Sequence, residues 1–117
     1  LLITIRPNVR FHDGNVMDAE AVRYSLDRHL NMQGSFRRGE IGAMESVEVV
    51  DPRTVRIKLR APSAAFLSQL TDRAGMIVSP AAAEAAGRNF GTRPVCAGPF
   101  RFVERVAQDR IVVERFA

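Results

Sequence analysis

Residues 45–60, ESVEVVDPRTVRIKLR, contain two stretches in which apolar and polar side chains alternate, separated by the short sequence DPR. In the second stretch the apolar residues are Val55, Ile57 and Leu59, and the basic residues are Arg56, Lys58 and Arg60. Because successive side chains of a strand point to opposite faces, this period of two predicts a strand with one buried and one solvated face. Pro52 fixes a backbone angle that suits a tight turn. The sequence therefore predicts a β-hairpin and an antiparallel sheet.

Further strand and helix patterns fill the rest of the chain. Strands are expected at residues 1–7, in the hairpin 45–60, at 75–80 (GMIVSP) and as a second hairpin within 100–116, and helices at 19–30, after Ser63 as N-cap, and from Pro80 to Gly87. Gly87 suits a helix end because glycine adopts left-handed backbone angles without steric cost. This order predicts an α+β fold with a mainly antiparallel sheet and about three helices.

The strongest helix signal lies at residues 19–30. Asp18 suits the N-cap, where a carboxylate accepts hydrogen bonds from the free amides of the first turn. Met17 and Val22 have the spacing of a hydrophobic staple. One side of this helix consists of Ala21, Val22, Ser25, Leu26, His29 and Leu30. We interpret that side as the face that packs on the core.

The stretch FHDGNVMDAE brings His12, Asp13, Asp18 and Glu20 close together in sequence, and these residue types bind metals or transfer protons. A zinc site needs three or four converging ligands, but the other candidate ligands, His29 and Cys96, are remote in sequence. Asp-Gly-Asn at residues 13–15 is a turn signal. We interpret the cluster as a turn followed by a helix cap, with no metal site and no catalytic residue. The chain also has no nucleophile-elbow or phosphate-binding motif, so we expect neither an enzyme nor a cofactor.

The chain has 17 Lys or Arg residues against 13 Asp or Glu residues, which gives a net charge of +4. The basic residues are scattered, and there is no Trp and one Tyr. Nucleic-acid binding is typical of clustered basic residues with stacking aromatic residues, so we expect no nucleic-acid partner. Cys96 is the only cysteine and cannot form an internal disulfide. Its apolar neighbours favour a buried, unreactive thiol.

The segment TIRPNVRFHDGNVMDAEAVRYSLDRHL resembles the signature region of the family 5 extracellular solute-binding proteins, in which a strand, a turn of the type F-H-D-G and a helix of the type Y-S-L-x-R follow one another. Three later blocks are similar to that family in the same order: residues 45–72, 73–82 and 97–116. Two positions depart from the family pattern. Cys96-Ala97 replaces the usual Gly-Thr, and Asn8 replaces a usual Gly, which puts only local turn geometry in doubt.

The resemblance implies a receptor of an ABC importer for peptides, nickel or glutathione, placed in the periplasm or held outside the cytoplasm by a lipid anchor. It implies a two-lobed periplasmic-binding-protein-like fold of type II, of which residues 1–117 are a single partial domain, the small subdomain of the first lobe. The ligand is then shared with the missing lobe, and a membrane permease is the partner. An alternative is a solute-sensing domain of a transcriptional regulator.

The resemblance also points to ligand-facing segments, the loop 35–41 and the stretch 72–80. The candidate ligand-binding residues there are Arg37, Arg38, Arg73, Met76 and Ser79. An arginine pairs well with a carboxylate. The alternative is that each of these arginines is a solvated loop residue and that Met76 packs in the core. The chain begins within a strand pattern, so we expect a piece of a longer protein whose bared edges allow homodimers.

Overall fold

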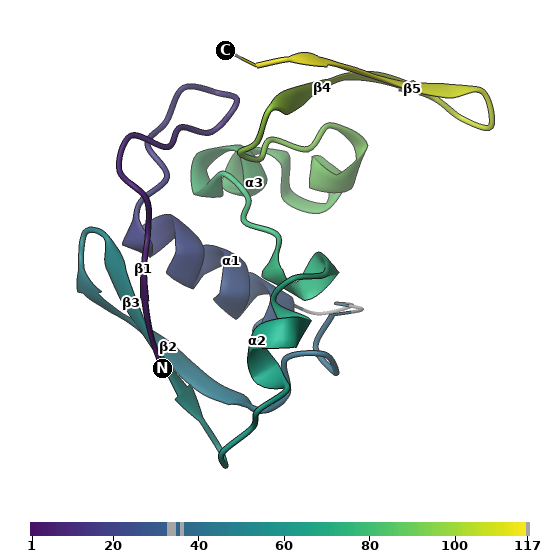
Figure 1. Ribbon diagram of the computed structural model, residues 1–117. Helices are drawn as coiled ribbons and strands as arrows, with labels where there is room; N and C mark the ends of the chain where they lie inside the picture. Colours follow the sequence, from purple (N-terminus) through teal and green to yellow (C-terminus); the bar gives the residue numbers. More distant parts are fainter. Residues whose placement is uncertain (33–34, 36, 117) are drawn as a thin grey trace.

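The computed structural model describes all residues except 33–34, 36 and 117, and it shows strands and helices in the order expected of an α+β fold (Figure 1). The elements are β1 (Leu2–Thr4), α1 (Ala19–Asn31), β2 (Met44–Asp51), β3 (Thr54–Leu59), α2 (Phe66–Gln69), η1 (Arg73–Gly75), α3 (Pro80–Ala86), η2 (Gly87–Thr92), β4 (Phe100–Val106) and β5 (Arg110–Arg115). Here η marks a 3₁₀-helix. The predicted α+β class is confirmed. In the described part of the chain no helix is long and apolar enough to cross a membrane.

Strands β1, β3 and β2 form a three-stranded antiparallel sheet in that order, with β3 in the centre. The predicted hairpin is confirmed, because Val47 pairs with Ile57 and Val49 with Val55 across β2 and β3. Helix α1 crosses one face of this sheet (Figure 1). The alternation in β3 explains the arrangement, since Val55 and Ile57 are buried whereas Arg56 and Lys58 are exposed.

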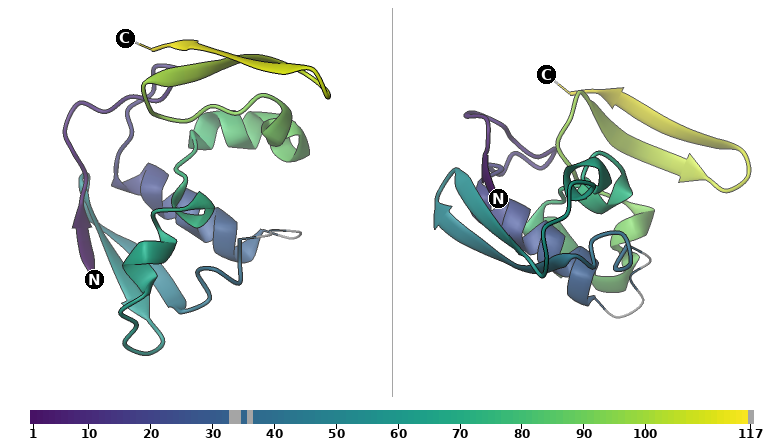
Figure 2. Two further views of the ribbon diagram at one scale, coloured as in Figure 1. Left: turned by 45° about the vertical axis from the view of Figure 1, so that its right-hand side comes forward. Right: turned by 60° about the horizontal axis from the view of Figure 1, so that its bottom comes forward.

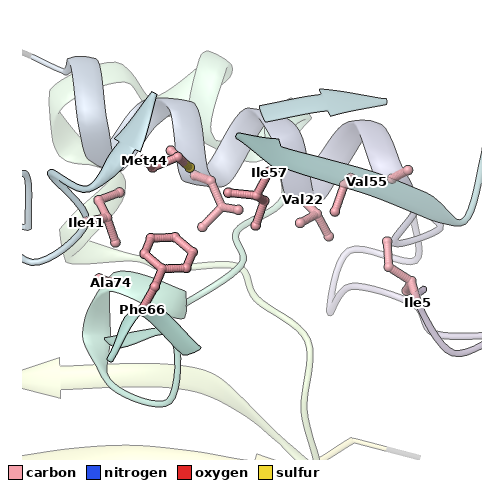
Figure 3. Close-up of a cluster of buried hydrophobic side chains, with 10 residues drawn as sticks. Ile5, Val22, Ile41, Met44, Val55, Ile57, Phe66 and Ala74 are labelled. Carbon is pink, nitrogen blue, oxygen red and sulfur yellow. The ribbon is translucent and has the colours of Figure 1, made fainter. Parts of the chain in front are cut away.

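The main core lies between this sheet, α1 and α2 (Figure 3). Its buried members are Ile5, Ala19, Val22, Leu26, Ile41, Met44, Val55, Ile57, Phe66 and Ala74. Met17 packs against the same cluster that contains Val22, as the staple spacing predicts. Burial of aliphatic and aromatic side chains is the dominant stabilising contribution to a fold of this size.

Helix α1 begins as the sequence predicts and ends one residue later than expected. The carboxylate of Asp18 accepts a hydrogen bond from the amide of Ala21 at 2.9 Å, so this N-cap is confirmed. Glu20 in the first turn pairs with Arg23, and the last turn carries Arg28 and His29. Both charge positions are favourable to the helix dipole.

Two expectations for the middle of the chain are wrong. Ser63 does not cap a helix, because α2 begins at Phe66 and follows Ala65, whose side chain has no oxygen to accept a capping bond. Residues 75–80 do not form a strand. Gly75 ends η1 and Pro80 begins α3, and between them the backbone groups of Met76 and Val78 bond to side chains of α1 in place of a neighbouring strand. In this segment Val78 makes a single antiparallel bridge, to Cys96.

The C-terminal hairpin is confirmed as β4 and β5, which pair only with each other among the described residues. It lies at the opposite end of the molecule from the three-stranded sheet (Figure 2). The register places Phe100, Phe102, Ile111 and Val113 on one mainly apolar face, together with Arg105 and Arg115. Two ion pairs, Arg101–Glu114 and Arg110–Glu104, lie on the other face. The apolar face is open to solvent, with Phe100 at 58%, Ile111 at 65% and Val113 at 52% exposure.

Candidate functional site

The F-H-D-G-N turn is built by its own backbone. The amide of Phe11 donates to the carbonyl of Asn15 at 2.8 Å, and the amide of Gly14 donates to the carbonyl of Phe11 at 2.9 Å. Gly14 has a φ of 88°, which glycine tolerates and other residues rarely adopt. The side chain of Phe11 is fully buried. The predicted turn is therefore present, and it is anchored to the protein by its aromatic residue.

The turn and the helix cap are present as predicted, and the side chains of the turn also contact segments that are distant in sequence. Oδ2 of Asp13 accepts a hydrogen bond from the hydroxyl of Ser79 at 2.6 Å, across 66 positions of sequence. Nε2 of His12 lies 3.2 Å from the carbonyl oxygen of Gly98. The ring of His12 also packs edge-on against Phe116, with centroids 4.9 Å apart. These contacts join the turn to the start of α3 and to the base of the C-terminal hairpin.

Asp13 is held as a carboxylate. Partial burial raises the pKa of Asp13, but hydrogen bonds from the Ser79 hydroxyl and from Asn15 together outweigh it, so the pKa lies below its ordinary value. The charged Asp13 carboxylate is therefore well suited to accept the hydrogen bond from the Ser79 hydroxyl. Within the part of the chain that the structure describes, no three His, Cys, Asp or Glu side chains are grouped closely enough to hold a metal ion. Cys96 is half-buried, and burial raises the pKa of its thiol, which disfavours the reactive thiolate.

The loop 35–41 lies at the C-terminal end of α1. Phe36 in this loop, and residues 33–34 before it, lie outside the described residues. The Arg37 side chain forms an ion pair with Glu40 at 2.5 Å. The guanidinium of Arg38 donates to the carbonyl oxygens of Leu30 at 2.9 Å and Met32 at 3.2 Å. Both arginines therefore already contact groups of the protein near the end of α1.

Arg73 and Met76 lie at either end of the η1 turn and are exposed. The side chain of Arg73 is 68% exposed, and its ion pair with the neighbouring Asp72 is long, at 3.9 Å. The Met76 side chain is 57% exposed and so is not a core residue. Ser79 is different, because it is fully buried, donates to Asp13 and accepts a bond from the Ala82 amide as the N-cap of α3. The hydroxyl of Ser79 is thus engaged within the fold.

Four of the five candidate residues belong to segments next to the C-terminal end of α1, while Ser79 lies beside the His12–Asp13 turn. Arg38 bonds to the last turn of α1, and the Met76 carbonyl bonds to His29 of the same helix at 3.0 Å. Sequence analysis missed the role of His29 and Ser25 in holding this region. The signal was present, because both are polar residues within the face of α1 that otherwise packs apolar side chains.

The described surface has open hollows. One, of about 300 Å³, is lined by the apolar residues Ile3, Ile5, Val9, Met17, Val22, Leu26, Leu70 and Ile77, with Gly75 and Arg6 at its margin. Another, of about 350 Å³, lies between the His12–Asp13 turn and the hairpin and includes Arg93, Arg101 and Glu114. Small-molecule sites usually bury most of the ligand surface. Both hollows are open to solvent, so neither encloses a small molecule by itself.

The whole chain is similar to parts of longer known proteins. Over residues 1–117 the chain matches the bacterial extracellular solute-binding proteins, family 5 Middle. It is 38% identical over 116 residues to the glutathione-binding protein GsiB of Pectobacterium atrosepticum, which covers 98% of this chain and 23% of GsiB.

Two solved structures are similar to the whole chain. The first is the periplasmic binding protein AgaA of A. tumefaciens R10 in complex with agropinic acid, with a TM-score of 0.89 and 31% identity over 98% of this chain and 23% of AgaA. The second is NikZ from Campylobacter jejuni in complex with Ni(L-His), with a TM-score of 0.86 and 25% identity over 97% of this chain and 23% of NikZ. The chain thus spans about a quarter of the length of each of these proteins.

Proposed function

The chain belongs to family 5 of the bacterial extracellular solute-binding proteins, and from this premise we propose that it is part of a receptor that binds a peptide or a similar small solute for an ABC importer. The observation that carries the proposal is the match to the family over all of residues 1–117. The likeness of the fold to AgaA supports it. Members of this family are transport proteins, so the proposed activity is binding without catalysis.

We propose that residues 1–117 form the small subdomain of the first lobe of a two-lobed receptor. The share of GsiB that the chain covers, 23%, supports this placement. The exposed apolar face of β4 and β5 supports it too, because a patch of this kind usually marks an interaction surface. The ligand is then shared with the second lobe, since one wall would leave it largely in water.

Arg73 is the residue we propose for direct contact with the ligand, through a carboxylate of the solute. Its guanidinium is exposed, and its ion pair with Asp72 is long. Arg37, Arg38 and Met76 lie near the same end of α1 and are proposed as further contacts. Ser79 is proposed to act only through its place at the start of α3, because its hydroxyl is engaged with Asp13.

The test is isothermal titration of glutathione into the full-length protein that contains this chain. Wild-type protein is expected to bind with micromolar affinity or better, and Arg73→Ala to weaken binding about tenfold to a hundredfold, as loss of a hydrogen-bonded ion pair does. Arg88→Ala removes another exposed arginine of the same chain and serves as the matched control. Equal affinity of Arg73→Ala and Arg88→Ala would remove Arg73 from the site.

The isolated 117-residue chain provides the second arm of that titration. It is expected to show no measurable heat with glutathione, because the other wall of the cleft is missing. Micromolar binding to the isolated chain would contradict the division of the ligand between two lobes. Failure of the full-length protein to bind either glutathione or a panel of dipeptides would count against the proposed receptor function itself.

We propose that the full receptor works outside the cytoplasm, periplasmic or lipid-anchored, and delivers its solute to a membrane permease. For the isolated chain we propose a homodimer formed through the apolar face of β4 and β5, because Phe100 and Ile111 would otherwise remain exposed. Light scattering over rising protein concentrations is expected to show a dimer mass, and Ile111→Lys is expected to restore the monomer. A monomer mass for the unsubstituted chain at every concentration would refute the dimer.

A further inference from the structure

Residues 76–79 lie along α1, and polar side chains hold their backbone. The Ser25 hydroxyl accepts a hydrogen bond from the amide of Val78 at 2.9 Å, and its single hydrogen is within reach of the Val78 carbonyl at 3.2 Å and the Ala21 carbonyl at 2.9 Å. One turn further along α1, Nε2 of His29 lies 3.0 Å from the carbonyl oxygen of Met76. Two side chains of a helix thus satisfy backbone groups that a neighbouring strand would otherwise bond.

The role of Nε2 of His29 in this contact follows from its partner. A carbonyl oxygen only accepts hydrogen bonds, so Nε2 must carry the hydrogen in this contact. At the other end of the segment, the Asp13 carboxylate accepts from the Ser79 hydroxyl at 2.6 Å. Residues 76, 78 and 79 are therefore each held by one polar side chain. We call His29, Ser25 and Asp13 the polar clamp.

We propose that the polar clamp sets the position of Arg73 and Met76 on the ligand-facing surface, and that His29 is the positioning residue that fixes the Met76 end. The inference rests on the proposed function, because it assigns these exposed side chains to solute binding. Residues 73–76 form one tight turn, closed by a bond from the Met76 amide to the Arg73 carbonyl at 3.2 Å. Anchoring the Met76 carbonyl therefore fixes the whole turn, including the stem of Arg73.

The exposure of Arg73 and Met76 shows why contacts from other residues are needed to position the turn 73–76. Arg73 and Met76 are mostly exposed, so packing of their own side chains does little to position them. Ala74 between them is fully buried and fixes only the inner side of the turn. Backbone bonds from the Gly75 amide to Asp72 and from the Met76 amide to Arg73 keep the shape of the turn, and the hydrogen bond from His29 ties its outer end to the last turn of α1.

The experiment compares three variants of the full-length protein at α1. His29→Leu removes the donor, His29→Gln keeps an amide donor at the end of the side chain, and Asn31→Ala is a matched control in the same turn that bonds only Asp27 among the described residues. Hydrogen–deuterium exchange of peptides spanning residues 72–80 reports the clamp, and titration with glutathione reports binding. His29→Leu is expected to exchange faster in this segment and to bind about three- to tenfold more weakly, the effect of one lost hydrogen bond.

His29→Gln is expected to restore both the slow exchange and the affinity, and Asn31→Ala to leave both unchanged. Unchanged exchange in His29→Leu would overturn the clamp whatever the protein binds. Faster exchange with unchanged glutathione affinity would overturn the link from the clamp to the ligand surface. If the wild-type protein binds no glutathione, the proposed function fails for that solute. The link between clamp and ligand surface falls with it, although the exchange data still decide whether the clamp exists.

Discussion

Replacing Phe66 by alanine is expected to lower the free energy of unfolding by about 3–5 kcal/mol, the range for deleting a buried aromatic side chain. Phe66 is 2% exposed and belongs to the main core. Its ring points from α2 toward Ile41 and the face of the sheet (Figure 3). Because its neighbours in the core, among them Ile41 and Ala74, are fully buried, removal of the ring would leave a cavity inside the main core.

The natural control is Leu67→Ala in the same turn. Leu67 is 55% exposed, so its truncation is expected to change the free energy of unfolding by less than about 1 kcal/mol. Urea unfolding followed by circular dichroism would measure both variants in the same background. A domain of this size has a total stability of about 5–15 kcal/mol, so Phe66→Ala alone could leave the chain mostly unfolded. Equal midpoints for the two variants would show that Phe66 does not organise the core.

Gly75→Ala is expected to be the most disruptive glycine-to-alanine substitution among the described glycines. A Cβ on Gly75 would lie 1.8 Å from the carbonyl oxygen of Leu70 and 2.6 Å from its carbonyl carbon. Both atoms belong to the backbone, so the clash cannot be relieved by rotating a side chain. Overpacking usually costs about 1–3 kcal/mol, and here we expect the upper end of that range or more because the chain itself must move.

Gly39→Ala is the control for this substitution, because a Cβ at Gly39 meets no atom within 4 Å. Thermal unfolding should show a lower midpoint for Gly75→Ala and little change for Gly39→Ala. Gly75 lies between Arg73 and Met76, so the displaced turn is also expected to weaken solute binding by the full-length protein. Unchanged stability of a Gly75→Ala variant would contradict this prediction, because it would mean that residues 70–75 can shift enough to accept the added methyl group.

Local sequence patterns predicted the elements whose hydrogen bonds close within a few residues. The hairpin at β2 and β3, the helix that starts after Asp18, and the hairpin at β4 and β5 all followed from periodicity, caps and turn residues. The family was also recognisable from residues alone, and the match over 1–117 confirms it. The strands and the helix depend on contacts between residues that are near one another in sequence. The family is recognised from sequence blocks that its members share.

Sequence patterns did not predict the structure where the hydrogen-bond partners of a segment come from a distant part of the chain. The apolar stretch 75–80 has the composition of a strand, but its backbone is held by Ser25 and His29 of α1. The polar residues Ser25 and His29 stand out on the apolar face of α1, but nothing local indicates that residues 76–78 are the segment they bind. The hydrogen bond between Asp13 and Ser79 could not be predicted either, because 66 positions of sequence separate the two residues.

The candidate site shows the same division. Sequence comparison marked the segments around Arg38, Arg73 and Met76, but it could not rank their side chains. The structure separates them, because Ser79 is fully buried and bonded, Arg38 bonds the end of α1, and Arg73 is largely exposed. Exposure and existing partners depend on how α1, η1 and α3 pack, and no single segment contains that information.

By itself, the sequence determined the α+β class, two hairpins, the main helix and the membership of a transport family, because short-range hydrogen bonding and apolar periodicity are written into adjacent residues. The tertiary structure alone decided that residues 76–79 lie against α1, that the F-H-D-G turn bonds to α3, and that the last hairpin exposes an apolar face. Those features depend on side chains brought together by burial of the core. Burial is non-directional, so it selects which distant groups meet only once all the elements have packed.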